Sequence, residues 1–205
     1  MENMKIKIPF RRERNSVSVV RLDGLIATNR GLNDVGLAPV FEKAFGKKPN
    51  ALALVINSPG GSPVQSSLIG ARIRRLADEK KIPVYAFVED VAASGGYWLA
   101  VSADEIYLDP SSVVGSIGVI SSGFGFNQLI ERYGIERRVY TAGTSKSMLD
   151  PFQRQKDEDV VRLKGLLEDI HQTFRDYVIE RRGNKLADRD LSLIHISEPT
   201  RPMNI

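Results

Sequence analysis

The chain has 205 residues, of which 42% are hydrophobic and 26% charged, a composition typical of one folded domain rather than a disordered chain. It has no cysteine, which excludes disulfides and thiolate metal sites, and we expect neither a metal nor a cofactor. No run approaches the roughly 18 apolar residues of a membrane-spanning helix, and the N-terminus lacks the apolar region of a signal peptide.

The formal net charge of +4 is concentrated near the N-terminus. Within residues 1–15 the charged side chains are Lys5, Lys7, Arg11, Arg12 and Arg14, against Glu2 and Glu13. Such an arm can lie on anionic lipid or nucleic acid, but a solvated, disordered arm is the simpler interpretation. We therefore expect no nucleic-acid partner, and at most a peripheral contact with a membrane.

Short apolar and β-branched runs alternate with helical spacing along the rest of the chain. In chain order we predict a strand over 17–22, a helix over 33–45, a strand over 51–56, a helix over 63–77, a strand over 84–88, a helix over 94–102, a strand over 105–108, an extended segment over 113–120, a helix over 127–133, a strand over 137–140 and a long helix over 155–181. Strands that alternate with helices predict an α/β domain with parallel strands, which we place at residues 16–190.

Two further expectations concern burial and the end of the chain. In the helix over 63–77, the spacing of Val64, Leu68, Ala71 and Leu76 predicts that these residues face the core. Residues 191–205 follow the long helix without a clear period, and they resemble the stray translation of a sequencing adapter. We expect this tail to be non-native and to lie outside the fold.

Ser94 lies where a nucleophilic serine is best placed, directly after a predicted buried strand and at the start of a helix. N–H groups at a helix N-terminus favour the negative charge that develops on a carbonyl oxygen. Gly95 and Gly96 would let a substrate backbone approach closely. Taken alone, however, the segment is explained equally well by a serine that caps a helix.

A second glycine-bearing loop, 57–61 (NSPGG), follows the strand predicted over 51–56. Open α/β folds place their sites at the ends of parallel strands, and the glycine N–H groups could form half of an oxyanion hole. A tight turn that needs positive φ is the simpler interpretation of this loop on its own. Two such loops after neighbouring predicted strands favour a site more than either does alone.

A serine nucleophile needs a base, and histidine is scarce. His195 lies in the suspect tail, and His171 lies within the long predicted helix, where a structural role is expected. A lysine whose pKa is lowered by burial is the remaining candidate. Lys146 lies in a loop of small and hydroxyl residues after a predicted strand, although composition alone favours a solvated side chain there.

Five short motifs occur in an order that resembles the signal peptide peptidase A family. They are 57–61 (NSPGG), 92–97 (AASGGY), 103–107 (ADEIY), 115–119 (GSIGV) and 142–146 (AGTSK). The resemblance runs from about residue 17 to residue 190. It implies a Clp-protease/crotonase-like fold of repeated ββα units with a long C-terminal helix.

The same resemblance implies roles for individual residues. Ser94 would be the nucleophile of a Ser–Lys dyad and Lys146 its general base. Gly61 and Gly95 would supply the oxyanion hole, and the Ser116 hydroxyl would orient the lysine. A hydroxyl suits a neutral amine, because it orients the lysine without an acidic partner that would keep it protonated.

The resemblance also implies an assembly and a class of substrate. Members form rings or domes in which a neighbouring subunit delivers the lysine, so we expect a homo-oligomer. Substrates would be extended or unfolded peptides, such as remnant signal peptides, with small or apolar side chains at the cleavage site. We expect a cytoplasmic enzyme, peripheral to the inner membrane at most. A membrane-anchored or periplasmic enzyme is the alternative if an upstream segment has been removed.

Two other functions share the expected fold. A crotonase-type acyl-CoA enzyme would use the same oxyanion hole but would need carboxylates in its pocket, for which Glu89 and Asp90 are candidates. A non-catalytic scaffold would be expected to lose Ser94 or Lys146, and both are present.

Overall fold

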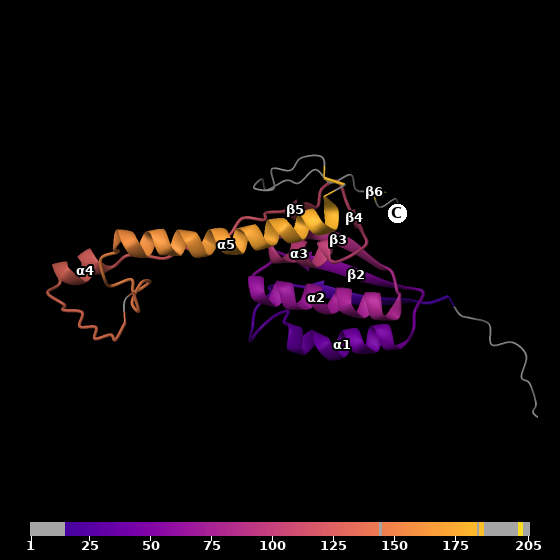
Figure 1. Cartoon of the computed structure of the whole chain (residues 1–205), viewed down its shortest axis with the longest axis horizontal. Helices are drawn as coiled ribbons and strands as arrows, with labels where there is room; N and C mark the ends of the chain where they lie inside the picture. The colour runs from indigo at the N-terminus through magenta and orange to yellow at the C-terminus, as the bar shows by residue number, and fades with distance from the viewer. Residues whose placement is uncertain (1–14, 144, 184, 187–200, 203–205) are drawn as a thin grey trace, which may run out of the picture.

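The computed structural model describes residues 15–143, 145–183, 185–186 and 201–202, in which strands and helices alternate along the chain (Figure 1). The elements are β1 Val17–Asp23, α1 Asp34–Gly46, β2 Ala51–Ser58, α2 Pro63–Lys80, β3 Val84–Ala93, α3 Gly95–Val101, β4 Glu105–Leu108, β5 Val113–Gly115, α4 Asn127–Arg132, α5 Asp157–Arg182 and β6 Arg201–Pro202. The predicted α/β domain with a long C-terminal helix is confirmed.

The strands form a parallel sheet in the order β1-β2-β3-β4-β6, because a helix connects each of the first strands to the next. Burial alternates along β1, where Val20 and Leu22 are buried while Val19 and Arg21 are exposed. The Ser18 hydroxyl, on the same face as Val20, donates to a carbonyl of α1. The even-numbered side chains of β1 therefore meet the helices.

Beyond their C-terminal ends, the main strands continue into a second, much shorter layer of parallel pairing. Ile26, after β1, bridges Gly61, after β2. The last residues of β3, 91–93, turn away from β4 and pair with β5. Each repeat thus has a long strand, a short strand or bridge and, in the first three repeats, a helix. This is the form in which the expected ββα units occur.

Helix α2 presents a face to the core that differs from the predicted one. Its buried residues are Ser66, Ile69, Gly70, Ile73, Leu76 and Ala77. Of the predicted set only Leu76 is buried, while Val64 and Leu68 are 64% and 46% exposed and Ala71 is exposed. The helix has apolar residues on two adjoining stripes. The one that contains Gly70 faces inward, where a Cβ on Gly70 would lie 3.1 Å from the Trp98 ring of α3.

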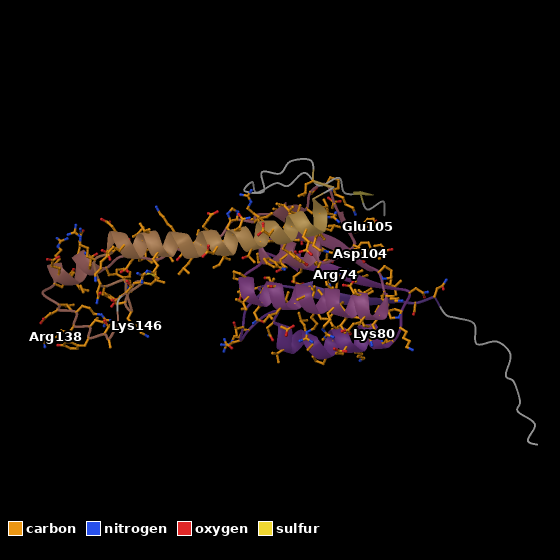
Figure 2. All side chains as sticks on the ribbon, viewed as in Figure 1. Arg74, Lys80, Asp104, Glu105, Arg138 and Lys146 are labelled. Atoms are coloured by element: carbon orange, nitrogen blue, oxygen red, sulfur yellow. The ribbon has the colours of Figure 1, made fainter. Side chains whose placement is uncertain are left out.

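The strand predicted over 137–140 is absent from the structure, and the extended segment over 113–120 is a strand only at β5. Arg137 instead pairs with Asp150, and Arg138 with Glu136. This segment lies far from the sheet (Figure 2), so no edge is available to pair with it. Residues 1–14 and most of 191–205 lie outside the described residues, although Arg201–Pro202 pair with β4.

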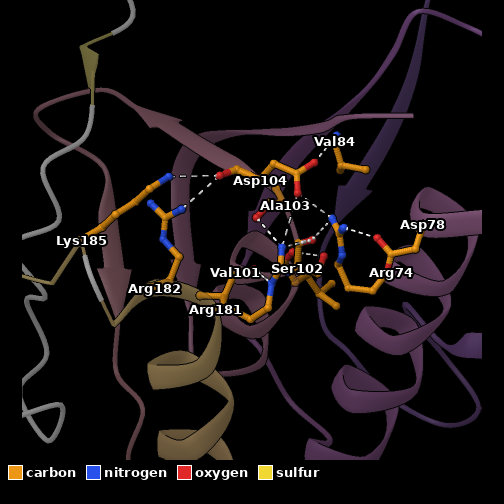
Figure 3. A network of polar contacts seen from close by, with 11 residues as sticks. Arg74, Asp78, Val84, Val101, Ser102, Ala103, Asp104, Arg181, Arg182 and Lys185 are labelled. Carbon is orange, nitrogen blue, oxygen red and sulfur yellow. Dashed lines mark hydrogen bonds and ion pairs between the residues drawn. The ribbon is translucent and has the colours of Figure 1, made fainter. Parts of the chain in front are cut away.

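The C-terminal end of α5 is fixed to the end of α3 by hydrogen bonds (Figure 3). The Arg181 guanidinium donates to the carbonyl oxygens of Val101, Ser102 and Ala103 at 3.2–3.4 Å. These carbonyls belong to the last turn of a helix and the residues after it, where intrahelical donors are lacking. A cation placed there also complements the negative end of the helix dipole.

Asp104 joins this contact to the sheet (Figure 3). Its carboxylate accepts from the Val84 N–H at 2.8 Å and from Arg74 of α2 at 3.0 Å. Its carbonyl accepts from Arg182 and Lys185. The end of α5 is therefore held against β3, α2 and α3 together, which fixes the direction in which the helix runs.

Helices α1 and α2 are joined by a partly buried ion pair that makes stability depend on pH. Arg72 binds both carboxylate oxygens of Asp34 at 2.7 Å, and this hydrogen bonding lowers the pKa of Asp34. A lowered pKa in the folded state stabilises the fold above the unfolded pKa of about 3.9, and the effect is lost as pH falls through the folded value. We predict that Asp34→Asn costs about 1–3 kcal/mol at pH 7, because Arg72 loses its charged partner.

Urea unfolding at pH 7 and at pH 3 measures this effect. The difference between Asp34→Asn and the unmodified chain should shrink at pH 3. Glu79→Gln is the matched control, because Glu79 and its partner Arg75 are both half-exposed, and it should change stability by less than about 0.5 kcal/mol. A destabilisation by Asp34→Asn that is equal at both pH values would contradict this account.

Candidate active site

Ser94 occupies a strained turn between β3 and α3. Its backbone has φ 51° and ψ −120°, which a residue with a Cβ rarely adopts. Its hydroxyl makes no capping hydrogen bond to α3, so the helix-cap interpretation of Ser94 is wrong. A serine on a sharp strand-to-helix turn presents its Oγ outward, as nucleophilic serines in other folds do.

The 57–61 loop packs directly against this turn. A Cβ on Gly60 would lie 2.6 Å from the Gly95 nitrogen and 2.9 Å from the Ser94 Cβ. Gly60 also has φ 95°, so two independent constraints require glycine here. The two glycine-bearing loops that the sequence places after neighbouring strands are therefore in contact.

Gly61 and Gly95 each present a backbone N–H beside Ser94. In the bridge between Ile26 and Gly61, the Ile26 N–H donates to the Gly60 carbonyl and the Ser62 N–H donates to the Ile26 carbonyl. In the described part of the chain, neither the Gly61 N–H nor the Gly95 N–H has an acceptor. Gly95 is also the first residue of α3, where the N–H groups have no partner within the helix. Two free donors at one place suit a developing oxyanion.

Ser116 is held next to Ser94 by the second layer of strands. The Ser94 N–H donates to the Gly115 carbonyl at 2.7 Å, and Ser116 follows directly with φ 54°. Its side chain is partly exposed. The structure thus brings together four of the five predicted site residues: Ser94, Gly61, Gly95 and Ser116.

A small cavity of about 140 Å³ opens beside Ser94. Its lining residues are Gly61, Pro63, Ser66, Ser94, Gly95, Trp98, Gly118, Val119, Ile120, Ile170 and Phe174. Sites for drug-sized ligands and cofactors usually occupy about 300–1,000 Å³, whereas an engineered cavity of about 150 Å³ takes up benzene. The space therefore suits one apolar side chain rather than a large ligand.

Helix α5 supplies one wall of this cavity, which the sequence did not predict. Phe174 packs on Trp98 with ring centroids 4.7 Å apart, and Ile170 lies one turn earlier. Trp98 is nearly buried and also lines the cavity, whereas Tyr97 is fully buried in the core. The helical spacing of α5 shows an apolar face, but nothing in it indicates what that face covers.

Lys146 is the predicted site residue that the structure does not bring to Ser94. It is exposed and lies beyond the N-terminal end of α5, far from the sheet (Figure 2). We call residues 121–156, which contain α4 and Lys146, the distal arm (Figure 1). Within this arm the centroid of the Phe126 ring lies 6.0 Å from that of the Phe124 ring and 5.6 Å from that of the Phe152 ring, in tilted contacts.

The other titratable candidates do not enter the cavity. His171 lies on α5 with Nδ1 4.0 Å from Glu168, and it is not among the lining residues. Glu89 binds Arg21, and Asp90 accepts from Asn57. Among the described residues no cluster of histidine and carboxylate side chains could hold a metal ion.

The strain at Ser94 predicts a difference in stability between two variants at this position. Ser94→Gly removes the Cβ that disfavours positive φ, so it should be about 1 kcal/mol more stable than Ser94→Ala, which keeps the Cβ. Denaturant unfolding of the two variants measures this difference. Equal stability, or a less stable Ser94→Gly, would show that the turn is not strained.

Residues 76–191 of the chain match the model of peptidase family S49. In addition, 87% of the chain is 55% identical to part of the Na(+)/H(+) antiporter NhaA of Brucella melitensis, and 80% is 32% identical to part of the chloroplastic serine protease SPPA of Arabidopsis thaliana. The chain spans about a quarter of each of these proteins, 25% in both cases.

Among solved structures, a mutant of the 1510-N membrane-bound stomatin-specific protease, in complex with a substrate peptide, is similar with a TM-score of 0.46. It is 24% identical, over 56% of this chain and 50% of that one. Within the ranges that the structure describes, no helix has the length and hydropathy needed to cross a membrane.

Proposed function

The chain belongs to peptidase family S49, and on this basis we propose that it is a serine endopeptidase of the signal peptide peptidase A type. It would hydrolyse extended or unfolded peptides, such as remnant signal peptides, with Ser94 as nucleophile and Lys146 as general base. The observation that carries the proposal is the geometry around Ser94: a strained, outward turn beside two free N–H groups and a cavity for one side chain.

The geometry suits acyl transfer. The Ser94 Oγ attacks the scissile carbonyl carbon while its proton passes to the neutral Lys146 amine. The carbonyl oxygen becomes an oxyanion that accepts hydrogen bonds from the Gly61 and Gly95 N–H groups. Lys146 then gives the proton to the leaving amine, which departs as the C–N bond breaks. Water, deprotonated by Lys146, hydrolyses the Ser94 ester and restores both side chains.

We propose that the lysine in each site comes from a second copy of the chain. Ser116, the residue expected to orient the lysine amine, is fixed beside Ser94, whereas Lys146 lies on the distal arm. A direct proton transfer needs a separation near 3 Å. The arm of a neighbouring copy would meet this requirement without any change in the fold of either copy.

Exposed apolar residues on both surfaces support this assembly. On the distal arm, Phe124 is 81% exposed to solvent and Tyr140 is 90% exposed. The body exposes Val64 and Leu68 on α2, which begins at the cavity residue Pro63. Contact between the two surfaces would bury apolar area on each, and repeated head-to-tail contact closes a ring when the rotation between copies divides a full turn.

A mixture of two inactive variants tests this arrangement. Ser94→Ala and Lys146→Ala should each lower kcat by at least about a thousandfold, because nucleophile and base are both required. When the two variants are co-expressed, random pairing around a ring should restore about a quarter of the sites. Hydrolysis of a fluorogenic peptide measures the recovery, and Lys164→Ala, on the exposed face of α5, is the control that should remain active.

Two outcomes would contradict a Ser–Lys dyad shared between two copies. One is a Lys146→Ala variant with normal activity. The other is no recovery in mixed oligomers whose composition mass spectrometry has confirmed, which would place both residues in one copy or exclude Lys146.

We infer that the cavity beside Ser94 accepts the side chain before the cleaved bond and that Ile170 limits its size. The ratio of kcat/KM for a peptide with Phe at this position to kcat/KM for a peptide with Ala there should rise by about tenfold in the Ile170→Ala variant. Pocket space equal to a few methylene groups changes discrimination between substrates by that order. Leu166→Ala is the control, because Leu166 is exposed on the same helix and does not line the cavity. If Ile170→Ala and Leu166→Ala discriminate equally between the Phe and Ala peptides, the cavity has no role in specificity.

The alternative functions receive less support. The cavity is small for a coenzyme A thioester, and Glu89 and Asp90 are engaged elsewhere, so a crotonase-type reaction has no carboxylate at the site. A scaffold role would not explain the strain at Ser94. The antiporter name belongs to proteins of which this chain matches one quarter, so it assigns no transport function to this chain. We propose cytoplasmic action, with at most peripheral membrane contact.

A further inference from the structure

An open groove runs along β1, at the edge of the sheet opposite to β6. In the described residues β1 pairs only with β2, so its outer backbone groups have no strand beside them. The groove has a volume of about 620 Å³ and lies between β1 and α1. Its lining residues are Ser16, Val17, Ser18, Val19, Val20, Pro39, Val40, Lys43, Ala44 and Lys47.

In the described residues, the Val17–Val20 part of this edge has no charge, proline or bulge, and the charged residues of β1, Arg21 and Asp23, lie at its C-terminal end. Natural edges usually carry charges, prolines or bulges, or a covering segment. Here Val17 and Val19, on the face away from the helices, are 59% and 64% exposed, and β1 pairs with β2 in continuous register. A regular edge with bare β-branched side chains is the surface to which an extended peptide adds as a further strand.

The charged residues that line the groove indicate which kind of peptide segment could bind in it. Lys43 and Lys47 are the charged residues that line it, and both are exposed. The acidic side chains of α1 are turned to other partners, since Asp34 binds Arg72 and Glu42 lies 3.7 Å from Arg75. The side of the groove formed by α1 is therefore positive.

Two occupants from this chain fit poorly. Residues 1–14 carry five basic side chains against two acidic ones, which repel the groove lysines. Pairing of β1 with β1 of a second copy would bring Lys43 and Lys47 of both copies to the same junction. Charge complementarity therefore favours a partner with acidic side chains.

We propose that this groove binds an acidic, extended segment of another protein as an added strand next to β1. The pleat specifies its pattern, because successive side chains of the added strand point to opposite faces. The hydrogen bond from the Ser18 hydroxyl to the Ala44 carbonyl shows which face of β1 is turned toward α1. On that face, acidic side chains of the added strand would meet Lys43 and Lys47. On the other face apolar side chains would pack beside Val17 and Val19.

A seven-residue peptide of alternating Val and Glu is the probe, with a Val/Lys peptide as its charge-reversed comparator. Fluorescence anisotropy with the full chain carrying Ser94→Ala, which prevents cleavage of the probe, should show at least tenfold tighter binding of the Val/Glu peptide. Lys43→Glu together with Lys47→Glu should reverse this preference. Lys80→Glu with Lys164→Glu, which changes the net charge equally on other helices, should leave it unchanged.

Peptidase activity separates this inference from the proposed function. In chains that retain Ser94, the Lys43 and Lys47 reversals should leave hydrolysis within twofold, because neither lysine lines the cavity at Ser94. Equal binding of the two peptides would overturn the proposal, as would an effect of the control pair as large as that of the groove pair. A Val19→Asp variant that changes the oligomer size but not peptide binding would instead assign the groove to a second copy.

Discussion

The contact between Gly60 and the turn at Ser94 and Gly95 is the constraint on which the rest of the site depends. No Cβ fits between the two loops, so the backbones touch and the strained serine stays in place. The strain must be balanced elsewhere, and the bond from the Ser94 N–H to the Gly115 carbonyl contributes. The residues proposed as nucleophile, oxyanion donors and lysine-orienting hydroxyl are thus positioned by backbone contacts between neighbouring repeats.

The long helix α5 connects this site to the opposite end of the molecule. Its C-terminal end is fixed to α3 and the sheet by Arg181, Arg182 and Asp104. Its middle forms a wall of the cavity through Ile170 and Phe174, and its N-terminal end carries the distal arm. The direction set by the ion pairs therefore determines both the size of the cavity and the position at which Lys146 is presented.

Each copy of the chain then offers a serine site at one place and a lysine at another. Within one copy the serine and the lysine stay apart because they lie in separately packed parts. The body packs around Trp98 and Phe174, whereas the distal arm has its own small aromatic cluster at Phe126. The apolar residues left exposed on α2 and on the arm are those that an interface between copies would cover.

The sequence by itself determined the α/β class and most of the order of strands and helices, because periodicity and glycine-bearing turns are local signals. It also placed Ser94 at the start of a helix, whereas the role proposed for Ser116 follows from the family resemblance. The sequence did not determine which stripe of α2 faces inward, that 137–140 has no strand partner, or that Ile170 meets the cavity. Those outcomes depend on which surfaces come together in space. The separation of Lys146 from Ser94 was likewise decided only by the tertiary structure, because the length of a rigid helix keeps them apart.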